Sequence, residues 1–306
     1  MGNINFSLKI DVDTERGTKE GVKNLLNLLN ELDIKATFLF SLGPDNTGRA
    51  LKRIFRPGFL KKVSRSNVVG MYGIKTLLNG VLWPGPHIAK RHADIMQEVS
   101  KQGHETGIHC YDHIYWQDNV HKLSQSEVSN EFNKACDCYF DVFGSKPLTA
   151  GAPGWQANEK SLKAYDDANL IYASDARGEV PFFPKINGIV FKTLQIPTTL
   201  PTLDELLGRP EFPESKLVKY YISLLKPQRS NIFTMHAEIE GMAKIKWFRE
   251  FLTALKSHPV NFLKMEEVAE IAFSQPNNIP TCNLAQGTVD GRSGTLAVQE
   301  IHRNDI

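Results

Sequence analysis

The stretch Ile4-Asn5-Phe6-Ser7-Leu8-Lys9-Ile10-Asp11-Val12-Asp13 decides the fold of this 306-residue chain. Apolar and polar residues alternate from Ile4 to Ile10, which is the period of a β-strand. Asp11 and Asp13 are two residues apart, so on a strand both carboxylates leave the same face. Such a strand ends at the carboxyl edge of its sheet, where the active sites of α/β folds lie. An acid at a strand end can also cap the next helix or turn, so the pair alone leaves both roles open.

Strand-like and helix-like segments alternate along the rest of the chain. The strand-like segments are 34–40, 104–108, 148–150, 170–174, 189–196, 231–235 and 259–263. The helix-like segments are 18–32, 87–102, 124–143, 158–168, 243–257 and 265–273. Repeated βα units predict an α/β fold with mostly parallel strands, as a barrel or a doubly wound sheet. We expect one domain over residues 1–274 and a loose tail over 275–306, which is rich in Pro, Asn, Gly and Thr and has no clear period.

The composition argues against several classes of protein. With 36 basic against 34 acidic residues, the charge is nearly balanced and does not indicate a nucleic-acid binder. The four cysteines form no C-x-x-C pair, which is typical of reduced thiols in a cytosolic protein. We expect no secretory signal, and we find no run of about 18 apolar residues that would predict a transmembrane helix.

A basic insertion over about residues 46–90 interrupts the βα pattern after the second predicted strand. No acidic residue occurs between Asp45 and Asp94, whereas basic residues are mixed with aromatic and aliphatic ones. The basic residues of this window are Arg49, Lys52, Arg53, Arg56, Lys61, Lys62, Arg65, Lys75, Lys90 and Arg91. This amphipathic mixture favours a segment that lies on an anionic membrane surface. A solvated, partly packed insertion and a nucleic-acid patch are the alternatives.

His109 and His113 have the spacing of a two-histidine metal site. Residues four apart on a helical turn face the same side, although surface histidines also reach this spacing by chance. Together with Asp13 they would form a three-ligand site with open positions for water and substrate, as in catalytic metal sites. Two histidines and a carboxylate suit zinc, cobalt and manganese, so the expected cofactor is a divalent metal ion of undetermined identity.

Asp11 and His236 are the candidates for proton transfer. Asp11 is not needed as a ligand and could act as the base on a water activated by the metal. His236 follows the short apolar strand 231–235 and could be the acid that protonates a leaving amine. The sequence therefore predicts metal-assisted hydrolysis.

Four short blocks carry a family resemblance. They are Ile10-Asp11-Val12-Asp13, His109-Cys110-Tyr111-Asp112-His113, Ala152-Pro153-Gly154-Trp155 and Met235-His236. In this order they resemble the motifs of the polysaccharide deacetylase (NodB-like) superfamily. The resemblance implies a distorted seven-stranded, TIM-like (β/α) barrel and metal-dependent hydrolysis of an N-acyl or O-acyl group on a sugar. It also implies that Asp11 is the base, that Asp13, His109 and His113 hold the metal, and that His236 is the catalytic acid.

Further blocks resemble the deformylase branch of this superfamily over about residues 4–270. They cover residues 10–18, 41–46, 173–178, 195–202 and 236–241. The resemblance implies removal of formyl from 4-deoxy-4-formamido-L-arabinose on undecaprenyl phosphate, which yields formate and a 4-amino sugar for lipid A. The positive charge of that sugar weakens the binding of cationic peptides such as polymyxin. The alternatives are a deacetylase for the N-acetyl groups of chitin or peptidoglycan, and an inactive barrel that binds a sugar lipid.

The block from Gly151 to Trp155 departs from the superfamily, because it lacks the arginine that steadies a catalytic aspartate there. We hypothesise that Arg177 or Arg16 supplies the missing charge near Asp11. The residues predicted to bind the substrate are Arg16, Trp155, Asp175, Arg177, Glu238 and Glu240. For the three acids the alternative is structural hydrogen bonding in loops. A lipid-linked substrate implies a cytoplasmic enzyme held peripherally at the inner membrane of a Gram-negative bacterium by anionic lipids.

Overall fold

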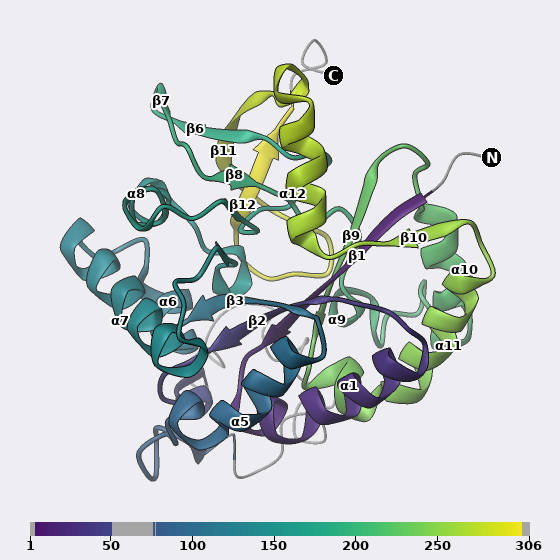
Figure 1. Ribbon diagram of the computed structural model, residues 1–306, viewed down its shortest axis with the longest axis horizontal. Helices are drawn as coiled ribbons and strands as arrows, with labels where there is room; N and C mark the ends of the chain where they lie inside the picture. The colour runs from purple at the N-terminus through teal and green to yellow at the C-terminus, as the bar shows by residue number, and fades with distance from the viewer. Residues whose placement is uncertain (1–3, 51–75, 77, 302–306) are drawn as a thin grey trace.

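The computed structural model describes residues 4–50, 76 and 78–301, and its main sheet is curled and parallel. Seven strands cross this sheet in the order β9-β1-β2-β3-β4-β5-β8, and β10 adds a short strand beside the start of β1. Their bounds are β1 (Ile4–Val12), β2 (Thr37–Ser41), β3 (Glu105–Cys110), β4 (Thr149–Ala150), β5 (Tyr172–Ala173), β8 (Leu194–Gln195), β9 (Ser230–His236) and β10 (Val260–Phe262). The predicted seven-stranded, distorted α/β barrel is confirmed (Figure 1).

Helices surround the curled sheet (Figure 1). They are α1 (Val22–Glu31), α5 (Ile88–Lys101), α6 (His113–Asn119), α7 (Gln125–Phe143), α8 (Glu159–Ala168), α9 (Leu203–Leu206), α10 (Glu214–Leu224), α11 (Ile245–Lys256) and α12 (Met265–Ser274). The apolar residues of β1 pack against this layer, as Phe6 does edge-on against Phe251 of α11, with 6.0 Å between ring centroids. The hydrophobic core therefore lies between the strands and the outer helices.

The polar residues of β1 alternate with those core residues and face the inside of the curled sheet. Ser7, Lys9 and Asp11 are all buried, so both faces of the strand are covered. The parallel register also sets Asp11 beside His236, the last residue of β9. The first strand thus places its acids inside the barrel, at the end where β9 finishes.

The prediction of a loose tail over residues 275–306 is wrong for most of that range, because residues 281–300 contain two strands. β11 (Thr281–Gly287) and β12 (Leu296–Glu300) join β6 (Phe183–Ile186) and β7 (Ile189–Val190) in a second, four-stranded sheet. Cys282, Leu284, Leu296 and Ala297 are buried by this pairing. The turn-rich sequence between the two strands hides their short alternating patterns.

Most of the predicted basic insertion lies outside the described residues, so only its two ends can be placed. The ends are tied to the barrel: Asn46 donates to the Asp112 carboxylate (2.6 Å), and Asn79 donates to that of Asp45 (3.2 Å). Next to Asn79, the turn residues 81–83 expose Val, Leu and Trp side chains. None of the helices in the described ranges is both long and apolar enough to cross a membrane.

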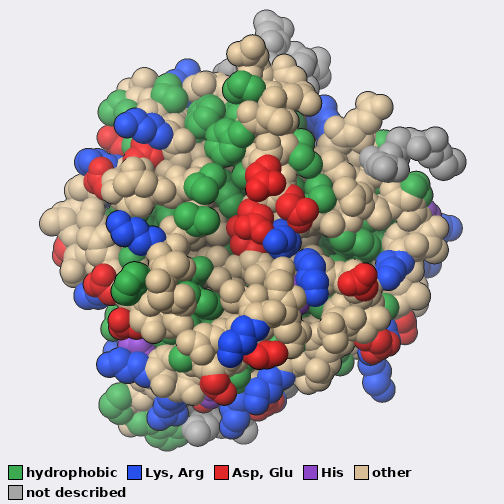
Figure 2. All heavy atoms as spheres, in the orientation of Figure 1, with side chains coloured by type: hydrophobic (Ala, Val, Ile, Leu, Met, Phe, Trp, Pro, Cys, Tyr) green, Lys and Arg blue, Asp and Glu red, His purple; other side chains and the backbone are tan. Residues whose placement is uncertain are grey.

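At the end of the barrel away from Asp11 and His236, Glu105 connects the start of β3 to α12. Its carboxylate accepts hydrogen bonds from the Thr37 hydroxyl (2.6 Å), the Tyr172 hydroxyl (2.6 Å) and the Glu266 backbone N–H (3.0 Å). Figure 2 shows acidic side chains gathered on the surface over the start of α12, whose first turn contains Glu266 and Glu267. Burial raises the pKa of Glu105 to about 7, against the hydrogen bonds from Thr37 and Tyr172.

Replacing Glu105 with glutamine should flatten the dependence of stability on pH. Because the folded protein keeps a proton that the unfolded chain releases near its ordinary pKa of 4.5, stability is full below that pH and falls as the pH rises towards 7. As the pH rises from below 4.5 to above 7, the wild type should lose roughly 3 kcal/mol of unfolding free energy through this group. Glu105→Gln should not show this loss. Urea unfolding of both proteins at about pH 4.5 and pH 8 measures the difference. Glu98→Gln on the surface of α5 is the control, and equal losses in wild type and Glu105→Gln would contradict the assignment.

Candidate active site

Three potential metal ligands meet at the carboxyl end of the first strands. Asp13 follows β1, His109 lies in β3, and His113 is the first residue of α6. Asp13 Oδ1 lies 3.2 Å from His109 Nε2 and 3.5 Å from His113 Nε2, and one ligand atom from each residue lies within 4.8 Å of the other two. The structure therefore brings together the three side chains that the sequence predicts as a metal site.

Local hydrogen bonds aim both imidazoles at Asp13. Asp112 caps α6 by accepting the Tyr115 N–H (3.0 Å), so the helix begins at His113 and its ring lies beside that of His109. His109 Nδ1 lies 2.6 Å from the carbonyl oxygen of Gly151. A carbonyl can only accept, so Nδ1 carries the proton and Nε2 offers its lone pair towards Asp13.

The environment of Asp13 fits a divalent cation. Within the described part of the chain, the buried Oδ1 has no hydrogen-bond partner, although it faces two imidazole nitrogens. Burial alone would raise the pKa of the Asp13 carboxyl, but the imidazoles of His113, His109 and His236 hold it well below its usual range. When His109 and His113 are neutral, the ionised carboxylate and their two imidazole lone pairs form a donor set that zinc and other transition metals prefer.

Asp11 and His236 flank this cluster on neighbouring strands. Asp11 is almost fully buried, and its Oδ1 has no hydrogen-bond partner among the described residues. His236 is partly exposed at the end of β9, and its backbone N–H donates to Glu240 (3.0 Å). The structure thus places one carboxylate and one imidazole beside the three-ligand cluster, in positions suited to moving protons.

Two of the predicted sugar contacts instead support the backbone of the site. Glu238 Oε1 accepts the N–H groups of Asp13 (3.1 Å) and Thr14 (2.9 Å), and Glu240 accepts that of His236. Their exposed fractions are 1% and 0%, so in this conformation both make the structural hydrogen bonds that are the alternative to sugar binding in the sequence-based prediction. Burial raises the pKa of Glu240 to about 8 and that of Glu238 well above its usual range.

Asp175 and Trp155 are likewise buried. Asp175 accepts the Ala152 N–H (2.6 Å) and a hydrogen bond from Gln195 (2.9 Å), and burial raises its pKa against these bonds. The Trp155 indole donates to the Thr198 hydroxyl (3.1 Å). Both side chains are buried, so the contacts that they make in this conformation are structural hydrogen bonds.

The two arginines proposed to steady Asp11 have other partners. Arg177 donates to Glu205 (2.6 Å) and to the Leu200 carbonyl (2.9 Å), and Arg16 forms an ion pair with Glu20 (3.2 Å). The basic side chain beside Asp11 is instead Lys9, whose Nζ lies 3.5 Å from Asp11 Oδ2. The structure therefore does not support the arginine hypothesis.

Two residues of the site were missed in the sequence. Lys9 carried a usable signal, because it lies two residues before Asp11 and so shares its face of the strand. Arg292 lies between β11 and β12, and its guanidinium stacks 4.3 Å from the centroid of the Trp155 ring while it donates to Glu205 (2.7 Å). No local pattern linked that part of the predicted tail to Trp155.

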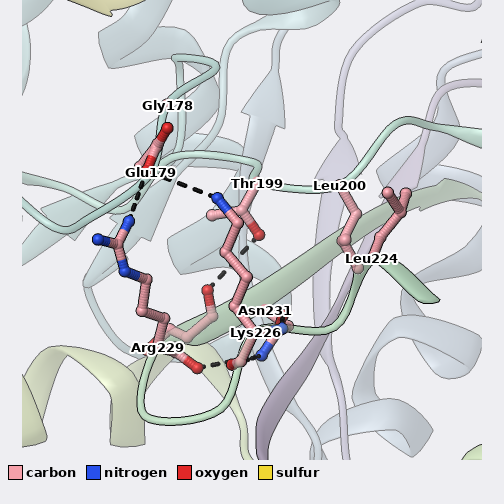
Figure 3. Close-up of a pocket in the computed structure, with 9 residues that line it drawn as sticks. Gly178, Glu179, Thr199, Leu200, Leu224, Lys226, Arg229 and Asn231 are labelled. Atoms are coloured by element: carbon pink, nitrogen blue, oxygen red, sulfur yellow. Dashed lines mark hydrogen bonds and ion pairs between the residues drawn. The ribbon is translucent and has the colours of Figure 1, made fainter. Parts of the chain in front are cut away.

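Two cavities in the described part of the chain have linings that include none of Asp13, His109 and His113. A hollow of about 260 Å³ lies between the start of α6 and α7 and is lined by Tyr111, Asp112, Tyr115, Glu127, Asn130, Glu131 and Lys134. A cavity of about 30 Å³ lies at the start of β9, where Lys226 and Arg229 both reach Glu179 (Figure 3). The second is water-sized and lies at the opposite end of β9 from His236, so it is not placed to serve the site.

Comparisons with known proteins agree with this geometry. The polysaccharide deacetylase family model matches residues 10–173. A probable 4-deoxy-4-formamido-L-arabinose-phosphoundecaprenol deformylase, ArnD, from Shewanella sediminis is 37% identical over 293 residues, which cover 95% of this chain and 93% of the relative. A protein of the same name from Wigglesworthia glossinidia brevipalpis is 35% identical, with 93% and 98% of the two chains covered.

Solved structures share the fold at low sequence identity. A Mycobacterium smegmatis protein described as a polysaccharide deacetylase aligns with a TM-score of 0.64 at 16% identity, covering 94% of this chain and 96% of its own. A probable polysaccharide deacetylase from Pseudomonas aeruginosa PAO1 aligns with a TM-score of 0.60 at 14% identity, covering 90% and 92%. The protein is a hydrolase that acts on an amide bond. The chain belongs to the polysaccharide deacetylase family, and within it to the ArnD-type deformylases.

Proposed function

We propose that this protein hydrolyses the formamide of 4-deoxy-4-formamido-L-arabinose on undecaprenyl phosphate. The observation that carries the chemistry is the cluster of Asp13, His109 and His113 with Asp11 and His236 beside it. The observation that favours this substrate is the identity of 35–37% with two relatives named for it. The products are formate and a lipid-linked 4-amino sugar.

Asp13, His109 and His113 would hold one divalent metal ion. When bound, the ion supplies Lewis acidity, which polarises the formyl carbonyl and makes a neighbouring water more acidic. Asp11 accepts a proton from the attacking water through its unpartnered Oδ1. His236 donates a proton to the sugar nitrogen as the C–N bond breaks, so the nitrogen leaves as an amine and the formyl carbon leaves as formate.

The reaction is tested with purified protein and a short-chain polyprenyl-phosphate carrying the formamido sugar. We expect formate to be released in equal amount to the free amine, and the acetamido analogue to react at least about 100-fold more slowly. Equal release of acetate from the analogue would favour the general sugar deacetylase instead. A protein that binds the lipid without releasing either acid would favour an inactive binding barrel.

We further propose that the segment over residues 46–90 holds the enzyme against anionic lipids of the cytoplasmic leaflet of the inner membrane. Support comes from the basic composition of the segment and from the exposed Val81, Leu82 and Trp83 at its described end. The ends of the segment are also joined to the site, since Asp45 accepts the Glu15 N–H (3.0 Å) close to Asp13. Membrane contact there would bring the site to a lipid-linked substrate.

Reversing four charges of this segment should release the protein from membranes. Replacing Lys52, Arg53, Lys61 and Lys62 with glutamate removes attraction of about 1 kcal/mol per residue near an anionic surface. Sedimentation with vesicles that contain phosphatidylglycerol measures the bound fraction at low and high salt. Four substitutions of exposed lysines elsewhere, at Lys101, Lys122, Lys163 and Lys256, provide the control. Unchanged sedimentation of the segment variant would give this segment another role.

The product gives the enzyme a place in lipid A modification. Hydrolysis turns a neutral formamide into an amine, which carries a positive charge at neutral pH. Transfer of that sugar to lipid A would lower the negative charge of the outer surface and weaken the binding of polymyxin and other cationic peptides. The two relatives come from Shewanella and Wigglesworthia, which supports the same role in a Gram-negative cell.

A further inference from the structure

Lys9 is a buried ammonium group inside the barrel, and its contacts are unusual for a lysine. Its side chain is 0% exposed, and Nζ donates to the carbonyl oxygen of Ser174 at 2.9 Å. Ser174 follows β5, which lies four strands from β1 across the sheet, so the lysine spans the barrel interior. A charge buried this deeply is costly unless an opposite charge lies next to it.

Asp11 is the opposite charge. Among the described residues it is the carboxylate within ion-pair distance of Lys9, with 3.5 Å between Nζ and Oδ2. The two oxygens of Asp11 therefore have different surroundings: Oδ2 faces the lysine, while Oδ1 has no hydrogen-bond partner and lies 4.0 Å from His109 Nδ1. The ion pair engages one oxygen of the carboxylate and leaves the other, which is buried, without a hydrogen-bond partner.

Gly151 makes room for this arrangement. A Cβ added at Gly151 would lie 2.5 Å from Leu39 Cδ1, and also 3.1 Å from Cε and 3.2 Å from Nζ of Lys9. Gly151 begins the block Gly151-Ala152-Pro153-Gly154-Trp155, which contains no arginine. The indole of Trp155, at the end of the same block, lies under the lysine, with 5.4 Å from Nζ to its centroid. Gly151 and Trp155 thus both lie close to the ammonium group of Lys9.

We propose that Lys9 is the positioning residue for Asp11. It supplies the positive charge that the block from Gly151 to Trp155 does not contain. This inference rests on the proposed function, because it assumes that Asp11 accepts the proton during hydrolysis. Lys9 does not touch the substrate in this scheme. It holds the carboxylate by charge on one side, so that Oδ1 faces the water, and its bond to Ser174 holds the ammonium in turn.

A double-mutant cycle separates positioning from a structural role. Lys9→Gln keeps a donor for Ser174 without the charge, and Lys9→Met removes both. We expect either variant to lower kcat roughly 100-fold with little change in KM and an unchanged metal content. Combined with Asp11→Asn, the same change should cost almost nothing further, because Lys9 acts through Asp11. Lys101→Met, on the exposed end of α5, should behave as the wild type.

The outcomes of this cycle are distinct from those of the proposed function. The role of Lys9 would be overturned if the double variant lost kcat by the product of the two single losses. It would also be overturned if Lys9→Gln had the same kcat as the wild type. If Lys9→Met fails to fold, Lys9→Gln carries the cycle. A wild type that hydrolyses only the acetamido sugar would refute the deformylase proposal, and the cycle would then be measured on that substrate. A wild type that hydrolyses neither would overturn both.

Discussion

Asp13→Ala should lose both the bound metal and the activity. The carboxylate is nearly buried, its Oδ1 lies between two imidazole nitrogens, and no other acid is grouped with His109 and His113 among the described residues. Without it, two histidines remain, which is too few for tight binding of a divalent ion. We expect metal content below about a tenth of the wild-type value and a fall in kcat of at least about 1000-fold.

Elemental analysis and formate release measure these two losses on the same preparation of Asp13→Ala. Asp141→Ala, at an exposed position of α7, is the matched control and should keep both metal and rate. Thermal unfolding provides an independent readout, since a chelator should lower the Tm of the wild type but not that of Asp13→Ala. Full activity in a preparation without metal would contradict the assignment of the ligands.

Asp11→Asn should lose the activity while the metal stays bound. Asparagine has nearly the same shape, but its amide cannot accept the proton of the attacking water. Because Asp11 is not among the three grouped ligands, the metal content should remain near one ion per chain. Loss of a general base lowers kcat by roughly 100- to 10,000-fold.

The Asp11→Asn result is informative together with that of Asp13→Ala. The two acids are two residues apart on one strand face, so a merely structural effect would change metal content in both variants. We predict that elemental analysis separates them, with metal lost only in Asp13→Ala. Loss of metal in Asp11→Asn as well would mean that Asp11 is a ligand and that another group is the base.

The fold and the grouping of the three candidate metal ligands could be predicted because their signals are local or tied to strand ends. The alternation over residues 4–10 marks β1, and strands that end at one edge bring Asp13 and His109 together whatever the loops do. His113 could be added because it lies four residues from His109. These features depend on spacing in the sequence, which a single chain displays directly.

The supporting residues could not be predicted, because their roles depend on contacts between distant segments. Glu238 lies 225 residues from Asp13, and a loop glutamate gives no hint that it will be buried beneath that residue. Arg292 reaches Trp155 only because β11 and β12 pair with β6, and their short strands are separated by a turn-rich stretch. Lys9 was the one supporting residue with a readable position, but its alternation with apolar residues is equally typical of a solvent-facing lysine.

Titration of metal-free protein with a divalent metal, followed by formate release from the formamido-sugar lipid, tests the central claim most directly. We predict no formate without metal, a rise in rate that is linear with added metal, and a plateau at about one ion per chain. Asp13→Ala in the same titration should stay inactive at every concentration. Formate release by the metal-free protein at the rate of the loaded protein would contradict the account.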